Sequence, residues 1–146
     1  MDDAVARSPA RPISVARHPI YAVLLPVPIV CFFGALLTDI AYQGSGGNLI
    51  WVNFSSWLIA AGLLFGALAG LVLLIEAIRL RGGWLQFGLL LAAWIVELVN
   101  SFVHARDGWT AVVPLGLILS VVAVVLVLIA GWLWQSLRYS TDEVRT

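Results

Sequence analysis

The chain has 146 residues, of which 62% are hydrophobic and only 11% are charged. A soluble domain is typically about 45–50% apolar and about 25% charged, and a small domain has too much surface to hide so many apolar side chains. The composition excludes a soluble globular domain, and it also excludes intrinsic disorder, which needs low hydrophobicity. Eight basic and eight acidic residues cancel and form no basic stripe, which excludes nucleic acid as a partner. The composition therefore indicates an integral membrane protein.

A polar tail, residues 1–17, precedes the first apolar run, Ile20–Thr38, which carries no charged side chain. A helix needs roughly 20 apolar residues to cross the hydrocarbon, and three further apolar runs follow along the chain. Continuous apolar runs favour helices over barrel strands, which alternate polar and apolar residues. We therefore expect a four-span transmembrane domain over residues 18–139, followed by a polar tail, residues 140–146. The helices are expected at about 19–40, 54–79, 84–104 and 110–137.

Short connectors join the expected helices, including a glycine-rich segment at residues 43–48 and a turn at Gly82 and Gly83. Short connectors place consecutive helices antiparallel, so the expected fold class is all-α, an up-down-up-down four-helix bundle. Both termini and the second connector then share one side of the membrane, and that side holds seven of the eight arginines. The positive-inside rule places this side in the cytoplasm. We thus expect a multi-pass protein of the bacterial inner membrane with both tails cytoplasmic.

Three polar side chains share one face of the third expected helix, because Glu97, Asn100 and His104 are spaced i, i+3 and i+7. Glu97 lies about 10 Å deeper than His104, where an ionised carboxylate is costly unless it faces the bundle or finds a partner. Two interpretations stay open: an interhelical hydrogen bond, or a proton or ion pathway through Glu97. No second carboxylate is expected at this depth. The candidate polar cluster of the outer side comprises Asp39, Glu97, Asn100, His104, Arg106 and Asp107.

A second candidate polar cluster is expected on the inner side. It comprises Arg17, His18, Glu76, Arg79 and Arg81. Glu76 and Arg79 are spaced i and i+3, so they can pair along one helix. Charged side chains at membrane interfaces usually anchor the topology, and we take anchoring as the expected role of the interfacial charges in both clusters.

A tandem G-x-x-x-G pattern, Gly62, Gly66 and Gly70, lies on the second expected helix. Small residues at this spacing let two helix backbones approach closely. The pattern predicts either packing within the bundle or a homodimer face, and the sequence leaves both open.

The two histidines, His18 and His104, raise the possibility of a haem with two imidazole ligands. They are expected on opposite sides of the membrane, roughly 30 Å apart, so one haem iron could not take both within a single chain. A dimer could pair either histidine with its own copy. No cofactor is predicted, and haem stays an alternative. No Ser/His/Asp pattern, metal-ligand spacing or phosphate loop is present, so we do not expect an enzyme.

The ends of the expected helices resemble one known family. The first helix opens with His18-Pro19, contains Pro26 and Pro28 and closes at Asp39. The later features are a glycine-rich second span ending at Glu76, the pattern Asn100-x-x-x-His104-x-Arg106-Asp107, the segment Val113-Pro114-Leu115-Gly116-Leu117, and Gly131-Trp132-Leu133. This chain resembles the bacterial membrane proteins of the domain of unknown function 2231 family over about residues 17–139. The resemblance implies a four-span fold in the membrane. Some relatives are joined to Rieske-type iron–sulfur modules, which suggests electron transfer by analogy only.

The expected function is that of a small non-enzymatic membrane protein, either self-associating or serving as an accessory subunit. The alternatives are a haem-binding or electron-transfer module that uses His18 or His104, and a proton or ion pathway through Glu97. The expected partners are the lipid bilayer and either a second copy or another membrane protein.

Overall fold

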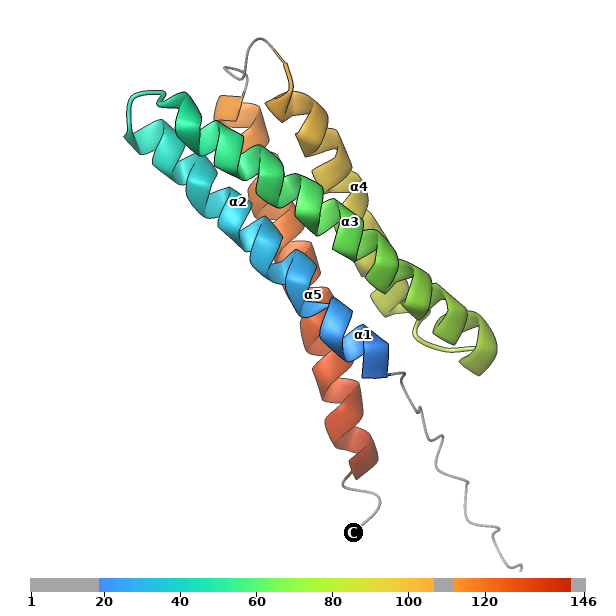
Figure 1. Ribbon diagram of the computed structural model, residues 1–146. Helices are drawn as coiled ribbons and strands as arrows, with labels where there is room; N and C mark the ends of the chain where they lie inside the picture. Colours follow the sequence, from blue (N-terminus) through green and yellow to red (C-terminus); the bar gives the residue numbers. More distant parts are fainter. Residues whose placement is uncertain (1–18, 107–111, 143–146) are drawn as a thin grey trace, which may run out of the picture.

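The structure is a computed structural model that describes residues 19–106 and 112–142. Its described residues form long helices that lie side by side in a bundle (Figure 1). Four helical segments are long and apolar enough to cross a membrane, which agrees with the all-helical, four-span expectation. The elements are α1 (Pro19–Leu24), α2 (Pro26–Gly44), α3 (Leu49–Leu80), α4 (Trp84–His104), the short π-helical segment η2 (Val112–Gly116) and α5 (Leu117–Asp142).

The helices pack in a ring in which α2 contacts α3 and α5, and α4 contacts the same two helices. The connector between α2 and α3 lies at the same end of the bundle as the last turn of α4, and we call this the His104 end (Figure 1). The turn between α3 and α4 lies at the other end, with α1, and we call this the Gly83 end.

The first span is divided at Leu25, directly before Pro26. Proline has no backbone N–H and disturbs the preceding turn, so α1 ends here and α2 begins. The Leu25 amide still donates to the carbonyl of Tyr21 at 3.0 Å, which keeps the two segments continuous. The span then runs to Gly44, beyond the end expected near residue 40.

Helix α3 begins at Leu49, several residues before the start expected at residue 54. The reason is a helix cap: the side-chain oxygen of Asn48 accepts a hydrogen bond from the Ile50 amide at 3.1 Å. An asparagine in this position satisfies an amide that has no partner within the helix. At the other end Arg81 and Gly83 adopt left-handed backbone angles, with φ of 51° and 81°, and make the tight turn into α4.

The fourth span begins irregularly, so the helix start expected near residue 110 is not a regular one. Within η2, Val113 is extended, with φ −108° and ψ 128°, because a residue before proline is pushed out of the helical region. Regular helix begins at Leu117 and reaches Asp142, beyond the expected end at residue 137. The irregular segment packs against α2, α4 and α5.

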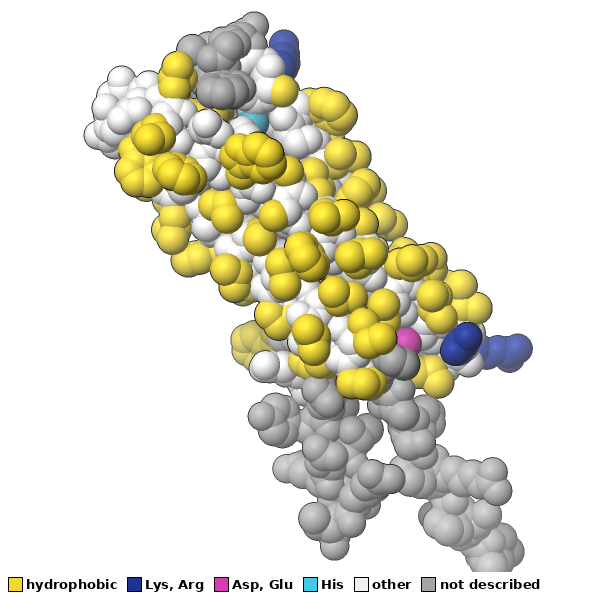
Figure 2. Space-filling view, viewed as in Figure 1, with side chains coloured by type: hydrophobic (Ala, Val, Ile, Leu, Met, Phe, Trp, Pro, Cys, Tyr) yellow, Lys and Arg dark blue, Asp and Glu magenta, His cyan; other side chains and the backbone are white. Residues whose placement is uncertain are grey.

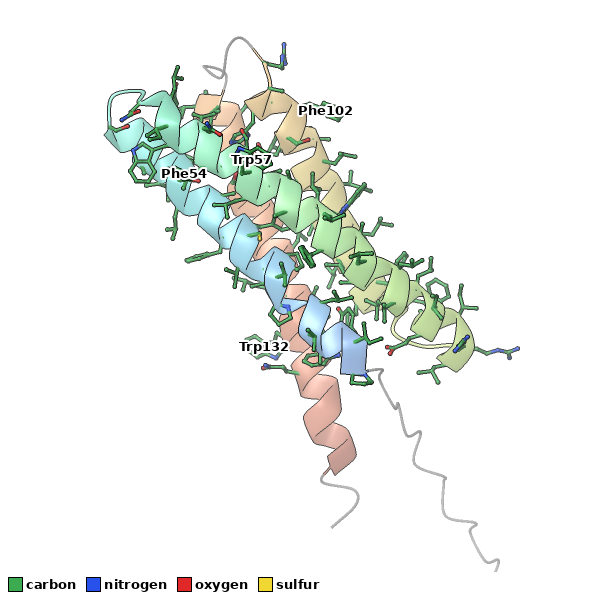
Figure 3. All side chains as sticks on the ribbon, viewed as in Figure 1. Phe54, Trp57, Phe102 and Trp132 are labelled. Atoms are coloured by element: carbon green, nitrogen blue, oxygen red, sulfur yellow. The ribbon has the colours of Figure 1, made fainter. Side chains whose placement is uncertain are left out.

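The outer flank of the bundle is covered by large apolar side chains (Figure 2). Trp57 is 73% exposed and Trp132 is 76% exposed, and Phe54 and Phe102 also point outward (Figure 3). A monomeric soluble protein rarely exposes a continuous apolar surface of this kind, whereas hydrocarbon contact makes it favourable. On the face shown, arginine side chains gather only at the two ends of the bundle.

The three glycines of the α3 pattern lie in different surroundings. A methyl group at Gly62 would collide with the ring of Phe32 on α2, and one at Gly66 would lie 3.3 Å from Trp94 on α4. Both positions are buried inside the bundle. A methyl group at Gly70 would meet no described atom within 4 Å. The pattern therefore does not present one uniform face to a neighbour.

Candidate functional site

Asp39 lies on α2 and is completely buried, with an exposed fraction of 0%. Its Oδ1 accepts a hydrogen bond from the Ser55 hydroxyl at 2.6 Å and lies 2.9 Å from His104 Nε2. Its Oδ2 accepts from the Ser120 hydroxyl at 2.6 Å. Side chains from α3, α4 and α5 therefore converge on a carboxyl group from α2. All four spans meet at this point.

The hydrogen bonds of His104 fix which ring nitrogen carries a proton. Nδ1 lies 3.0 Å from the backbone carbonyl of Asn100, and a carbonyl can only accept, so Nδ1 donates. Nε2 lies 2.9 Å from the Asp39 carboxyl oxygen. A hydrogen bond between them needs one further proton, which either makes His104 an imidazolium or makes Asp39 a carboxylic acid. The pair therefore shares one proton in a buried position.

Glu97 and Asn100 extend this site deeper into the bundle. The Asn100 amide nitrogen donates to Glu97 Oε2 at 3.0 Å and to the Ser120 hydroxyl at 2.8 Å. Both side chains are 0% exposed, and Glu97 Oε1 and Asn100 Oδ1 have no hydrogen-bond partner among the described residues. We call the connected side chains the polar network: Asp39, Ser55, Glu97, Asn100, His104 and Ser120.

Glu97 was expected to have no second carboxylate at its own depth, and the structure adds a hydrogen-bonded link to a carboxylate at a different depth. Asp39 lies nearer the His104 end than Glu97, but three hydrogen bonds join the two side chains through Asn100 and Ser120. Asp39 was expected at the end of its helix, whereas α2 continues to Gly44 and carries Asp39 inside the bundle. The carboxyl group is buried among Ser55, His104 and Ser120 of the other three spans.

Apolar layers close the polar network on both sides. Toward the His104 end, Tyr42, Val52 and Val112 form a small buried cluster above it. Toward the Gly83 end lies the main core, which includes Phe32, Leu90 and other buried apolar side chains. Hydrogen bonds and charges act more strongly in such water-excluded surroundings than they do in water.

Gly116, where the irregular segment η2 ends, allows this close packing. A methyl group there would lie 3.2 Å from His104 Cε1 and 3.4 Å from Asn100 Oδ1. Any larger residue at this position must displace the imidazole ring or the amide. The irregular start of the fourth span is thus in direct contact with the network.

Two members of the network, Ser55 and Ser120, were not singled out from the sequence. Each is a small polar residue within a long apolar helix, but α3 also carries Ser56 directly beside Ser55, so the sequence alone does not single out the right serine. Of the other residues expected in the outer cluster, Arg106 is exposed and lies outside the network. Asp107 lies outside the described residues.

The residues expected in the inner cluster lie toward the Gly83 end, as far as they are described. Glu76 is half-buried, and Arg79 and Arg81 are exposed. Arg17 and His18 lie outside the described residues. This end also holds a buried polar pair, in which Gln86 Nε2 donates to the Tyr21 hydroxyl at 2.9 Å.

Ser55, His104 and Asp39 have the composition of a hydrolytic triad but not its connectivity. In a triad the serine and the aspartate contact opposite nitrogens of the histidine. Here both lie at Nε2, and Nδ1 is held by the Asn100 carbonyl. Ser55 also donates to Asp39 rather than to the imidazole. The geometry therefore differs from that of a hydrolytic triad.

In the described geometry the polar network offers no free imidazole nitrogen to a haem iron. Iron ligation needs a free imidazole nitrogen, and both nitrogens of His104 are hydrogen-bonded within the bundle. In the part of the chain that the structure describes, no group of three or more His, Cys, Asp or Glu side chains is placed to hold a metal ion.

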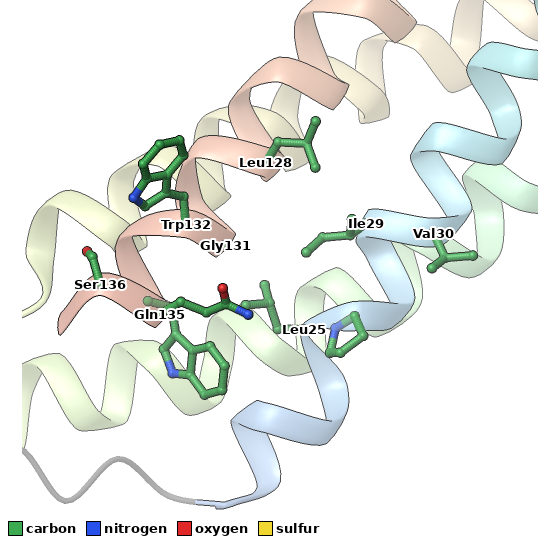
Figure 4. Close-up of a pocket in the computed structure, with 10 residues that line it drawn as sticks. Leu25, Ile29, Val30, Leu128, Gly131, Trp132, Gln135 and Ser136 are labelled. Atoms are coloured by element: carbon green, nitrogen blue, oxygen red, sulfur yellow. The ribbon is translucent and has the colours of Figure 1, made fainter. Parts of the chain in front are cut away.

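An apolar groove of about 630 Å³ lies between α2 and α5, toward the Gly83 end (Figure 4). Its lining residues include Leu25, Ile29, Leu128, Trp132, Gln135 and Ser136. None of its lining residues is charged. The groove offers space for apolar chains but no groups for acid–base chemistry, so the polar network is the candidate functional site.

The substitution Ser55→Ala tests the polar network, and the adjacent serine, Ser56, supplies the control. The substitution removes a donor from the buried Asp39 carboxyl group, and hydrogen bonds to charged groups are typically worth about 1.5–3 kcal/mol. Ser56→Ala is the matched control, because the Ser56 hydroxyl donates only to the carbonyl of Val52 in its own helix. We expect a loss in this range for Ser55→Ala and less than about 0.5 kcal/mol for Ser56→Ala in reversible unfolding of the purified protein in lipid–detergent mixtures. Equal losses would contradict the network.

Comparison with known protein families identifies a match. The sequence matches the model of a family described as a predicted membrane protein, DUF2231, over residues 17–144. No curated protein and no solved structure matches the chain. The match covers most of the chain and confirms the resemblance seen in the sequence. The chain therefore belongs to the DUF2231 family of predicted membrane proteins.

Proposed function

We propose that this chain is a non-enzymatic protein of the bacterial inner membrane that takes up and releases a proton at the Asp39–His104 pair. We further propose an up-down bundle with both termini cytoplasmic. The arginine distribution supports this orientation, because Arg79 and Arg81 follow the second span while Arg106 alone follows the third. In this orientation the His104 end faces the outside of the cell.

The observation that carries the proposal is the contact between His104 Nε2 and Asp39 Oδ1, which lie 2.9 Å apart in a buried position. A buried ionisable pair in a membrane span is expensive to keep and is a functional candidate by default. Histidine changes its charge within the physiological pH range more readily than other side chains. Ser55 and Ser120 hold the carboxyl group in place, so the pair can gain or lose a proton without losing its position.

The surroundings support exchange with one side of the membrane rather than conduction across it. Along α4, about 16 Å separates Glu97 from Gln86, and the α4 core residues between them are Leu90 and Ala93. The apolar layer between the polar network and the His104 end is much thinner, because Val52 in that layer lies one helical turn from Ser55. The proposed activity is therefore that of a proton-sensing accessory module whose site exchanges its proton with the outside.

The proton site can be tested by ring-¹⁵N NMR of histidine-labelled protein in lipid bilayers. The chain has two histidines, so His18→Gln leaves His104 as the single source of signal. We expect Nδ1 to stay protonated while the Nε2 signal changes with pH between about 5 and 8, and we expect Asp39→Asn to change the pH at which this happens. Arg106→Gln should leave the profile unchanged. A His104 signal that does not respond to pH would rule out the proposal.

Self-association is a second candidate, favoured by a groove of about 270 Å³ between α3 and α4. Gly66, Ala67 and Gly70 contribute to its lining, and small residues allow a neighbouring helix to approach closely. Within the tandem glycine pattern, Gly70 is the position that opens onto free space.

Gly70→Ile fills this groove, and we expect it to reduce cross-linking between copies in liposomes at least several-fold. Gly88→Ile is the matched control, because Gly88 on α4 also has no described atom nearby but does not line the groove. Gly62→Ile should instead impair folding through its collision with Phe32. Cross-linking that is the same in the Gly70 variant and the native chain would remove this candidate.

A further inference from the structure

The side chain of Asn100 uses both of its amide hydrogens inside the network. One goes to Glu97 Oε2 at 3.0 Å and the other to the Ser120 hydroxyl at 2.8 Å. Ser120 then gives its only hydroxyl hydrogen to Asp39 Oδ2 at 2.6 Å. The hydrogen bond that Asp39 receives from Ser120 thus depends on which way the Asn100 amide points.

Proton uptake by Glu97 creates a conflict in this arrangement. A proton on Oε1 finds no acceptor, because this oxygen has no hydrogen-bond partner among the described residues. A proton on Oε2 would point at an amide hydrogen of Asn100, so that two donors would face each other. Half a turn of the amide replaces its NH₂ group with Oδ1, which is buried and has no partner in the described structure. Oδ1 can then accept from Glu97.

We propose that Asn100 is a two-position hydrogen-bond switch that links a proton on Glu97 to the Asp39–His104 pair. When Glu97 is protonated, the turned amide presents Oδ1 to Ser120 as well, and Ser120 donates to Asn100 instead of Asp39. The pair then keeps Ser55 but loses one of its two hydroxyl donors. This inference rests on the proposed proton site and names Glu97 as the group that regulates it.

The surrounding side chains are compatible with such a link. The titratable described groups in the network besides Glu97 are Asp39 from α2 and His104 from α4, and α3 and α5 contribute only Ser55 and Ser120. An amide N–H donates a hydrogen bond but does not pass its proton on. Glu97 and the Asp39–His104 pair are therefore separate proton sites, linked through the orientation of Asn100, which acts as a positioning residue.

Glu97→Gln provides the test, because a neutral glutamine amide can donate to Asn100 Oδ1 as a protonated glutamate would. The readout is the ring-¹⁵N signal of His104 in the full chain with His18→Gln, in lipid bilayers. We expect Glu97→Gln to move the Nε2 signal in the presence of Ser120. In a Ser120→Ala background, the shift of the Nε2 signal caused by Glu97→Gln should fall to less than half of its size in the chain with Ser120. In a Ser56→Ala background the shift should keep its full size.

An equal shift of the Nε2 signal with and without the Ser120 hydroxyl would overturn the switch, because Glu97 would then act on His104 directly through space. Should Ser120→Ala fail to fold, Asn100→Leu breaks the same link with a side chain of similar size, and the same reduction is expected. The two proposals can fail separately. A His104 signal that ignores pH but still responds to Glu97→Gln only through Ser120 would contradict the proton site and support the switch.

Discussion

A carboxyl group inside the hydrocarbon must find its hydrogen-bond partners within the protein, and Asp39 imposes this constraint on the whole bundle. Lipid tails offer no donors, and an unsatisfied polar group in them costs several kcal/mol. Asp39 obtains its partners from the three other spans, through Ser55, His104 and Ser120. Apolar packing alone lets helices slide and rotate against one another. Three short hydrogen bonds to one carboxyl group restrict both movements at the His104 end.

Several local features of the chain make this convergence possible. The Asn48 cap starts α3 early enough to place Ser55 inside the bundle. The irregular start of the fourth span brings Gly116 against His104 without a side chain in between. The apolar cluster of Tyr42, Val52 and Val112 then seals the site. The same features that fix the helices also hold the Asp39–His104 pair near the His104 end of the bundle.

Much of this architecture could be predicted from the sequence, because span length and helical periodicity are local properties. The shared face of Glu97, Asn100 and His104 followed from spacing alone. The choice between Ser55 and Ser56 could not be predicted in this way, because it depends on how α3 is rotated toward its neighbours. Ser55 donates a hydrogen bond to Asp39, whereas Ser56 donates to a carbonyl of its own helix. The rotation of α3 also explains why Gly62 packs against Phe32 while Gly70 faces open space. The expected topology also placed Arg106 in the cluster, yet it is exposed at the helix end.

The measurement that tests this account most directly is a double-mutant cycle on Asp39 and His104, read out as the free energy of unfolding in lipid–detergent mixtures. If the pair is one unit, Asp39→Ala and His104→Ala each leave a buried partner unsatisfied, and removing one partner of such a pair typically costs about 3–5 kcal/mol. The double variant should then cost clearly less than the sum, with a coupling of about 1–3 kcal/mol. Additive losses would show that the two side chains act independently and would contradict the account.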